Sequence, residues 1–167
     1  MPGETKFKRR HRLRRKEIDV LSDAIEAVFG CPAFRETDNV EVGEPAGAQG
    51  RELVLVDGVP VAFYLDGKPI LTVRGLLKYP PTKAFVEVDM GAVPFVVKGA
   101  DVMCPGIVAA DPAIEPDAIV WVRDTKNKKP LAVGRALVKG TAMPKPNKGK
   151  AVKTLHYVGD ELWQFGN

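Results

Sequence analysis

VDMGAVPFVVKGADVMCPGI, the segment of residues 88–107, predicts a short capped helix between two buried strands. Its first residue ends a β-rich run, and an acidic residue and a glycine then turn the chain. A helix is expected over residues 92–98. Its first turn contains a proline, which is tolerated there because the backbone N–H groups of a first turn have no partner within the helix. Gly99 can take the left-handed φ that ends a helix. A short apolar strand follows over residues 102–104 and breaks at Pro105-Gly106.

The remainder of the second half is rich in short strands. They are expected over residues 84–88, 101–104, 119–123, 131–137 and 152–158. Strands at this spacing are typical of a closed or nearly closed barrel. Residues 124–129 are expected to form a polar hairpin tip. The Pro-, Lys- and Gly-rich residues 143–150 are expected to form a loop, because their prolines exclude both a helix and a central strand.

The order of turn, helix, glycine, strand and Pro-Gly resembles the start of a PUA domain, an RNA-binding pseudo-β-barrel. The resemblance rests on Val88, Asp89, Gly91, Ala92, Gly99, Ala100, Met103, Pro105 and Gly106. It implies that the second half of the chain folds as a PUA domain.

The first half predicts one helix packed on a small antiparallel sheet. Apolar residues recur at three- and four-residue steps over residues 16–29, so an amphipathic helix is expected to end near Gly30. Strands are expected over residues 39–42, 52–56, 59–65 and 70–73, with hairpin turns at Asp57-Gly58 and Asp66-Gly67. A short helix over residues 73–78 precedes two prolines, and a domain boundary is expected at residues 80–83.

The composition is that of a soluble globular protein, with 45% apolar and 28% charged residues in 167. This length allows one ordinary domain or two small ones. No apolar run approaches the roughly 18 to 20 residues of a membrane-spanning helix, so a cytoplasmic location without a membrane partner is expected. Cys31 and Cys104 lie in different halves without CxxC spacing. We therefore expect two buried thiols, and no metal site or cofactor.

Positive charge is concentrated at the start of the chain. Residues 1–16 hold eight of the 25 Lys and Arg and one of the 21 acids, a formal charge of +7 against −3 for the remainder. Such a basic arm suits contacts with RNA phosphates. A solvated arm that aids solubility is the alternative. The candidate phosphate-binding residues of the arm are Lys6, Lys8, Arg9, Arg10, Arg12, Arg14 and Arg15.

Catalytic constellations are missing from the sequence. His11 and His156 have no neighbouring Ser, Cys or carboxylate arranged as a triad, and both are expected to be structural or to face RNA. No phosphate-binding or dinucleotide-binding glycine motif is present. Asp89 is expected to hold the turn before the helix through backbone N–H groups, and Cys104 is expected to be buried. We therefore expect no enzymatic activity.

A wider resemblance extends over most of residues 50–165. The segments PILT (69–72), LLKYP (76–80), VDMGA (88–92), GADVMCPGI (99–107), LHY (155–157) and LW (162–163) are similar to the malignant-T-cell-amplified-sequence family and its archaeal counterparts, whose modules also occur in ligatin. The resemblance implies an archaeal, α+β protein with a small pre-PUA α/β-sandwich-like domain over residues 1–80 and a PUA pseudo-β-barrel over residues 81–167. Eukaryotic members of the family pair with density-regulated protein, so the resemblance also implies a translation-factor partner protein. We expect the chain itself to be a monomer.

Other PUA domains place RNA against the end of the short helix, the following strand and the last strand. Carried over to this sequence, that surface comprises Lys98, Gly99, Ala100, Asp101, Val102, Met103, Lys150 and Lys153. The lysine-rich loop and its flank add Lys139, Lys145 and Lys148. Lysines supply phosphate contacts, and the glycine lets an RNA backbone approach closely.

The resulting hypothesis is a non-catalytic RNA-binding protein of the translation apparatus. It would bind tRNA, the small ribosomal subunit or both, in initiation, reinitiation or recycling. Two alternatives stay open. One is a ribosome-assembly factor that binds precursor rRNA, and the other is the RNA-binding subunit of an RNA-modifying enzyme.

Overall fold

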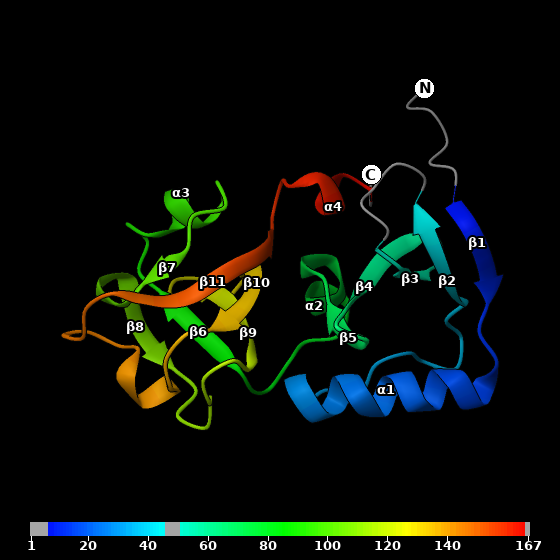
Figure 1. The fold of residues 1–167 in the computed structure, drawn as a ribbon, viewed down its shortest axis with the longest axis horizontal. Coiled ribbons are helices and arrows are strands. Elements are labelled where there is room, and N and C mark those ends of the chain that lie inside the picture. The colour runs from blue at the N-terminus through cyan, green and yellow to red at the C-terminus, as the bar shows by residue number, and fades with distance from the viewer. Residues whose placement is uncertain (1–6, 46–50, 166–167) are drawn as a thin grey trace.

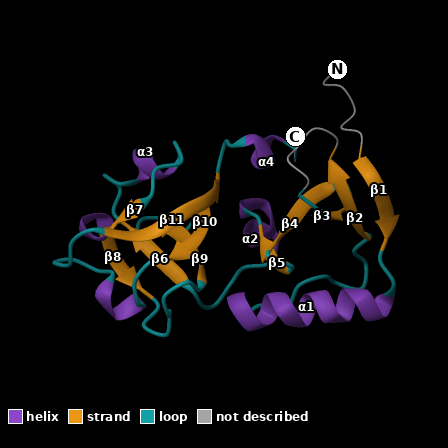
Figure 2. Cartoon of the chain, viewed as in Figure 1, coloured by secondary structure: helices purple, strands orange, loops and turns teal. Residues whose placement is uncertain are grey.

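The computed structural model describes residues 7–45 and 51–165 of the chain. Two lobes lie side by side, each built around its own β-sheet (Figure 1). Figure 2 shows that strands dominate both lobes and that the one long helix lies along the first lobe. None of the helices in the described ranges is long and apolar enough to cross a membrane.

The first lobe is a five-stranded antiparallel sheet in the order β1-β2-β3-β4-β5, with two helices. Its elements are β1 (Phe7–Arg12), α1 (Arg15–Phe29), β2 (Val40–Pro45), β3 (Leu53–Val56), β4 (Val59–Leu65), β5 (Lys68–Leu71) and α2 (Val73–Lys78). This arrangement confirms the prediction of one amphipathic helix on a small antiparallel sheet.

Local sequence explains the ends of these elements. Leu21, Ile25 and Phe29 recur every four residues and form the buried stripe of α1. Gly30 ends the helix with a φ of 71° and donates its N–H to the Glu26 carbonyl over 2.8 Å. In both predicted hairpins the Asp and the Gly of the turn have positive φ, which is the pattern of two-residue hairpin turns.

The basic arm contains a strand that the sequence analysis did not predict. Residues 7–12 form β1, which pairs antiparallel with β2 at the edge of the sheet. The pairing is irregular between Lys8 and His11, and Arg9 has a φ of 54°. An edge strand with a bulge and many charges is protected against pairing with other chains. The strand β1 is hard to predict from sequence, because polar residues occupy nearly every position and leave no alternation of apolar and polar residues.

The second lobe is a six-stranded, nearly closed sheet in the order β7-β11-β10-β9-β6-β8. Its elements are β6 (Phe85–Val88), α3 (Val93–Val96), β7 (Val102–Met103), β8 (Ile107–Ala110), β9 (Ile119–Asp124), β10 (Pro130–Ala136), β11 (Lys150–Tyr157) and α4 (Glu161–Gln164). Among the described strands, β6 and β9 form a parallel pair and the other pairs are antiparallel. The expected barrel-like architecture is confirmed.

Some expected boundaries in the second lobe were wrong. The helix α3 covers residues 93–96 and not 92–98, because residues 97–99 form turns instead of continuing the helix. Cys104 begins a 3₁₀ turn, Cys104–Gly106, where a strand was expected, and its N–H donates to the Gly149 carbonyl over 2.8 Å. The strand β8 and the helix α4 were missed, since each is only four residues long.

The two lobes share apolar packing. Trp121 and Val133 of the second lobe belong to the same buried cluster as the α1 stripe and the first sheet. The Trp121 indole N–H also donates to the Lys83 carbonyl over 2.9 Å. Leu162 and Phe165, at the C-terminal end, pack on that first-lobe core as well. The sheets change between β5 and β6, and a domain division between residues 80 and 81 stays a prediction.

Candidate nucleic-acid interface

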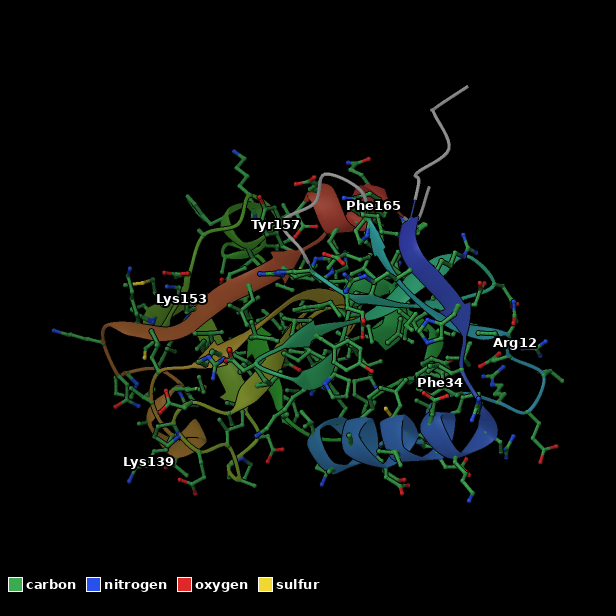
Figure 3. All side chains as sticks on the ribbon, turned by 45° about the vertical axis from the view of Figure 1, so that its right-hand side comes forward. Arg12, Phe34, Lys139, Lys153, Tyr157 and Phe165 are labelled. Carbon is green, nitrogen blue, oxygen red and sulfur yellow. The ribbon has the colours of Figure 1, made fainter. Side chains whose placement is uncertain are left out.

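The strand pair β7–β11 brings together two segments that the sequence analysis assigned to RNA. Met103 lies opposite Lys150, and Val102 lies opposite Val152, in antiparallel register. The segment of residues 98–103 is therefore beside the β11 residues Lys150 and Lys153. Both lysines are exposed, and Figure 3 shows Lys153 on the outer face of β11. We call residues 98–103 with Lys150 and Lys153 the β7–β11 edge.

Gly99 lies against an aromatic ring in this edge. Its φ is +88°, and a Cβ atom at this position would be 2.7 Å from Cε1 of Tyr157. Any larger residue would therefore strain the backbone and displace the ring. Tyr157 was not among the predicted site residues, because a single aromatic at the end of a strand gives no signal of its neighbour 58 positions earlier.

Asp101 ties the turn to β11. Its Oδ1 accepts the Thr154 N–H over 3.0 Å, and its Oδ2 lies 3.3 Å from Nζ of Lys150. The Thr154 hydroxyl donates to the Ala100 carbonyl over 2.9 Å. Asp101 therefore shapes the edge and offsets part of the Lys150 charge. No acidic side chain of the described residues forms a salt bridge with Lys153.

Asp89 holds the turn before α3, as predicted. Its Oδ1 accepts the Ala92 N–H over 2.9 Å, and its Oδ2 lies 2.9 Å from Nζ of Lys145. The hydrogen bond from the Lys145 ammonium holds the pKa of the Asp89 carboxyl below its usual range, against the opposing effect of burial. Lys145 thus fixes the loop of residues 143–150 to the α3 turn.

A shallow groove of about 300 Å³ runs between α3 and β7. Phe95 and Met103 are among its lining residues, and their exposed fractions are 65% and 44%. Exposed aromatic side chains can stack on unpaired RNA bases. Phe95 was missed by the sequence analysis, since its place in a short apolar run predicts burial.

Within the β7–β11 edge, Lys98 follows α3 and is exposed. Two other predicted lysines are also exposed, and Lys148 lies in the loop before β11. Lys139 precedes the 3₁₀ turn Gly140–Ala142, on the side of the lobe away from α3 (Figure 3). The structure thus does not bring Lys139 to the β7–β11 edge.

The basic arm lies in the other lobe. Figure 3 shows Arg12 on β1 and Lys153 on β11, at opposite sides of the molecule. Arg10 forms two hydrogen bonds with Glu41, at 2.9 and 3.0 Å, and lowers the pKa of that carboxyl. The backbone N–H of Arg14 donates to the Glu17 carboxylate over 3.0 Å, and the Arg15 guanidinium pairs with Asp19 over 3.4 Å.

The arm therefore presents Lys8, Arg9, Arg12 and Arg14 as exposed cations. None of them forms a salt bridge with an acid in the described part of the chain. Lys6 lies outside the described residues. The arm and the β7–β11 edge are two separate basic surfaces.

The remaining candidates for chemistry have structural surroundings. His156 is buried, which agrees with a structural role and not with an RNA-facing one. His11 is exposed on β1. Cys31 and Cys104 are buried free thiols, as predicted, and burial raises the pKa of each. No group of three potential metal ligands occurs among the described residues.

Comparison with known proteins places these observations in a family. A model of the PUA domain matches residues 84–158. An uncharacterized protein of Methanocaldococcus jannaschii is 42% identical over 161 residues, which cover 95% of this chain and 98% of that protein. Translation machinery-associated protein 20 of Eremothecium gossypii is 36% identical over 65% of this chain and 64% of its own length. Malignant T-cell-amplified sequence 2 of Homo sapiens is 34% identical over 68% and 65%.

Solved structures share both lobes. A hypothetical protein from Pyrococcus horikoshii has a TM-score of 0.79 at 32% identity, with 95% of this chain and 99% of that chain covered. A PUA-domain structure from Aeropyrum pernix has a TM-score of 0.82 at 28% identity and covers 96% of this chain. The chain therefore belongs to the family of PUA-domain proteins that includes the Methanocaldococcus jannaschii protein, and it is related to translation machinery-associated protein 20 and the malignant T-cell-amplified sequence proteins.

Proposed function

We propose that this protein is a non-catalytic RNA-binding protein of the translation apparatus that binds tRNA, the small ribosomal subunit or both through the β7–β11 edge. The observation that carries the proposal is the pairing of β7 with β11, which places Met103 opposite Lys150 and Val102 opposite Val152, the neighbour of Lys153. The names of the fungal relatives support a role in translation.

The chemistry of the edge suits RNA more than a small substrate. Lys153 has no acidic partner in the described ranges and is free to contact a phosphate. Phe95 and Met103 offer exposed apolar surface for an unpaired base. The groove between them is shallow and open, whereas small-molecule sites bury most of their ligand.

The hydrogen bonds of the buried His156 imidazole support the absence of catalysis. His156 Nε2 accepts the Val73 N–H over 3.0 Å, and Nδ1 lies 2.8 Å from Oδ2 of Asp160. Both ring nitrogens are thus occupied by structural hydrogen bonds in the interior. A general base must instead reach a proton of its substrate.

The test is binding of unfractionated tRNA and of small ribosomal subunits over a series of salt concentrations. The double variant Lys150→Gln and Lys153→Gln removes two charges, and glutamine avoids placing a second carboxylate beside Asp101. We expect the slope of log affinity against log salt to become shallower by about 1.4–1.8, for two lost phosphate contacts. Lys68→Gln with Lys83→Gln removes the same charge far from the edge and serves as the control. Equal slopes in both variants would remove the edge from the site.

Sedimentation of native lysate separates the alternative functions. Association with mature small subunits or tRNA supports the proposal. Association with immature particles would support the ribosome-assembly alternative, which binds precursor rRNA. Loss of a modified nucleoside in a deletion strain would support the RNA-modification alternative.

A further inference from the structure

The β9–β10 hairpin carries positive charge that the β7–β11 edge does not use. Its tip, Thr125–Lys129, contains three lysines. Lys128 pairs with Glu87, whereas Lys126 and Lys129 are exposed and have no salt-bridge partner among residues 7–45 and 51–165. The tip therefore presents two uncompensated cations to solvent.

A buried carboxylate fixes this tip to the barrel. Glu87 on β6 is only 5% exposed, and its Oε1 accepts the Arg123 Nε–H over 3.0 Å. Its Oε2 accepts the Thr125 hydroxyl over 3.1 Å, and Lys128 adds a further hydrogen bond to Oε1. The Arg123 guanidinium also lies 3.9 Å from the centre of the Phe85 ring.

A second carboxylate organises the backbone of the tip. Asp124 is buried and accepts the backbone N–H groups of Asn127 and Lys129. The tip is thus held by hydrogen bonds at both of its ends. A fixed backbone lowers the entropy cost of presenting lysines to a partner.

The position of the tip relates it to the β7–β11 edge. Val88 lies opposite Asp124 in the parallel pair β6–β9, so both strands finish at the same end of the barrel. The Thr125 N–H donates to the Val88 carbonyl over 3.0 Å, one residue before the turn that leads into α3. After Tyr157, which packs on Gly99, the Val158 N–H donates to the Leu131 carbonyl over 2.9 Å, two residues after the tip. The strand β11 therefore runs from Lys150 toward the hairpin tip.

We propose that the hairpin tip is a second phosphate-binding element for the RNA held at the β7–β11 edge, with Lys126 and Lys129 as its contacts. This inference rests on the proposed function. RNA is favoured over a protein partner because none of the exposed large hydrophobic side chains of the described chain belongs to residues 124–130. Protein interfaces need such buried apolar anchors, whereas lysines alone suffice for phosphates.

The test compares three double variants in tRNA and small-subunit binding over a salt series. They are Lys126→Gln with Lys129→Gln, Lys150→Gln with Lys153→Gln, and the control Lys68→Gln with Lys83→Gln. We expect the hairpin variant to make the salt slope shallower by about 1.4–1.8, with thermal stability near that of the wild type. Combining the hairpin and edge substitutions is expected to add the two changes, since the contacts are separate.

The possible outcomes distinguish this inference from the proposed function. An unchanged slope in the hairpin variant, together with a shallower slope in the edge variant, would overturn the hairpin inference and leave the proposed function standing. An equal effect in the hairpin variant and the control would also overturn it, because net charge alone would then explain both. A wild-type protein that binds neither probe would overturn both proposals.

Discussion

His156, the penultimate residue of β11, accepts the backbone N–H of Val73, the first residue of α2, over 3.0 Å. The bond joins the strand of the candidate interface to the helix of the other lobe. Because Nε2 accepts, the ring proton is on Nδ1, which donates to Asp160 over 2.8 Å. Asp160 also accepts the N–H groups of Tyr157 and Trp163 and so caps α4. One network therefore connects both lobes, the edge and the C-terminal helix.

Replacing His156 with alanine is expected to destabilise the whole protein by about 2–4 kcal/mol. The substitution leaves the Val73 N–H without its acceptor and opens a cavity beside Phe63, whose ring centre is 6.1 Å from that of His156. Denaturant unfolding measures the change. His11→Ala, at an exposed position, is the control and is expected to be neutral within about 0.5 kcal/mol. A His156 variant as stable as that control would show that the inter-lobe bond contributes nothing.

Alanine at Gly99 is expected to weaken both stability and RNA binding. The positive φ alone costs about 1 kcal/mol, and the new Cβ atom would also push against the Tyr157 ring. Gly58→Ala is the matched control, because Gly58 has a φ of +81° and open space around it. In a Tyr157→Ala background the extra cost at Gly99 should disappear. An equal cost at Gly58 and Gly99 in the wild-type background would contradict the packing of the ring on the glycine.

Glu87 is expected to make stability fall at acid pH. Burial opposes its ionisation, but hydrogen bonds from Lys128, Thr125 and Arg123 outweigh burial and hold its pKa below the usual range. Its contribution is therefore present above the ordinary glutamate pKa of about 4.3 and is lost as pH falls through the lowered value. Unfolding of Glu87→Gln should show a flatter dependence between about pH 5 and pH 3. Glu36→Gln, at a side chain that is 90% exposed, should leave the wild-type dependence intact.

The contribution of the basic arm can be tested without removing β1. Deleting residues 1–12 would expose the edge of β2, so the better variant is Lys8→Gln with Arg12→Gln, which leaves the Arg10–Glu41 pair in place. If both cations contact RNA phosphates, the salt slope becomes shallower by about 1.4–1.8. Because β1 and the edge lie in different lobes, this change should add to that of the Lys150 and Lys153 variant. An unaltered slope would mean that the arm is a solvated strand.

Sequence alone determined the features that depend on near neighbours. Gly30 ends α1, the Asp-Gly pairs turn the hairpins, and Asp89 caps the turn before α3, because each acts within a few residues of itself. The motif of residues 88–107 likewise identified the PUA module, since its order of turn, helix and glycine is local.

Tertiary structure alone decided which distant residues meet. His156 and Val73 are 83 positions apart, Lys150 and Asp101 are 49 apart, and Glu87 and Lys128 are 41 apart. The pairing of β1 with β2 and the packing of Tyr157 on Gly99 also follow from the assembled sheets. Strand register and barrel closure set these contacts, and they depend on the summed packing of both faces of a sheet, which no single segment of sequence specifies.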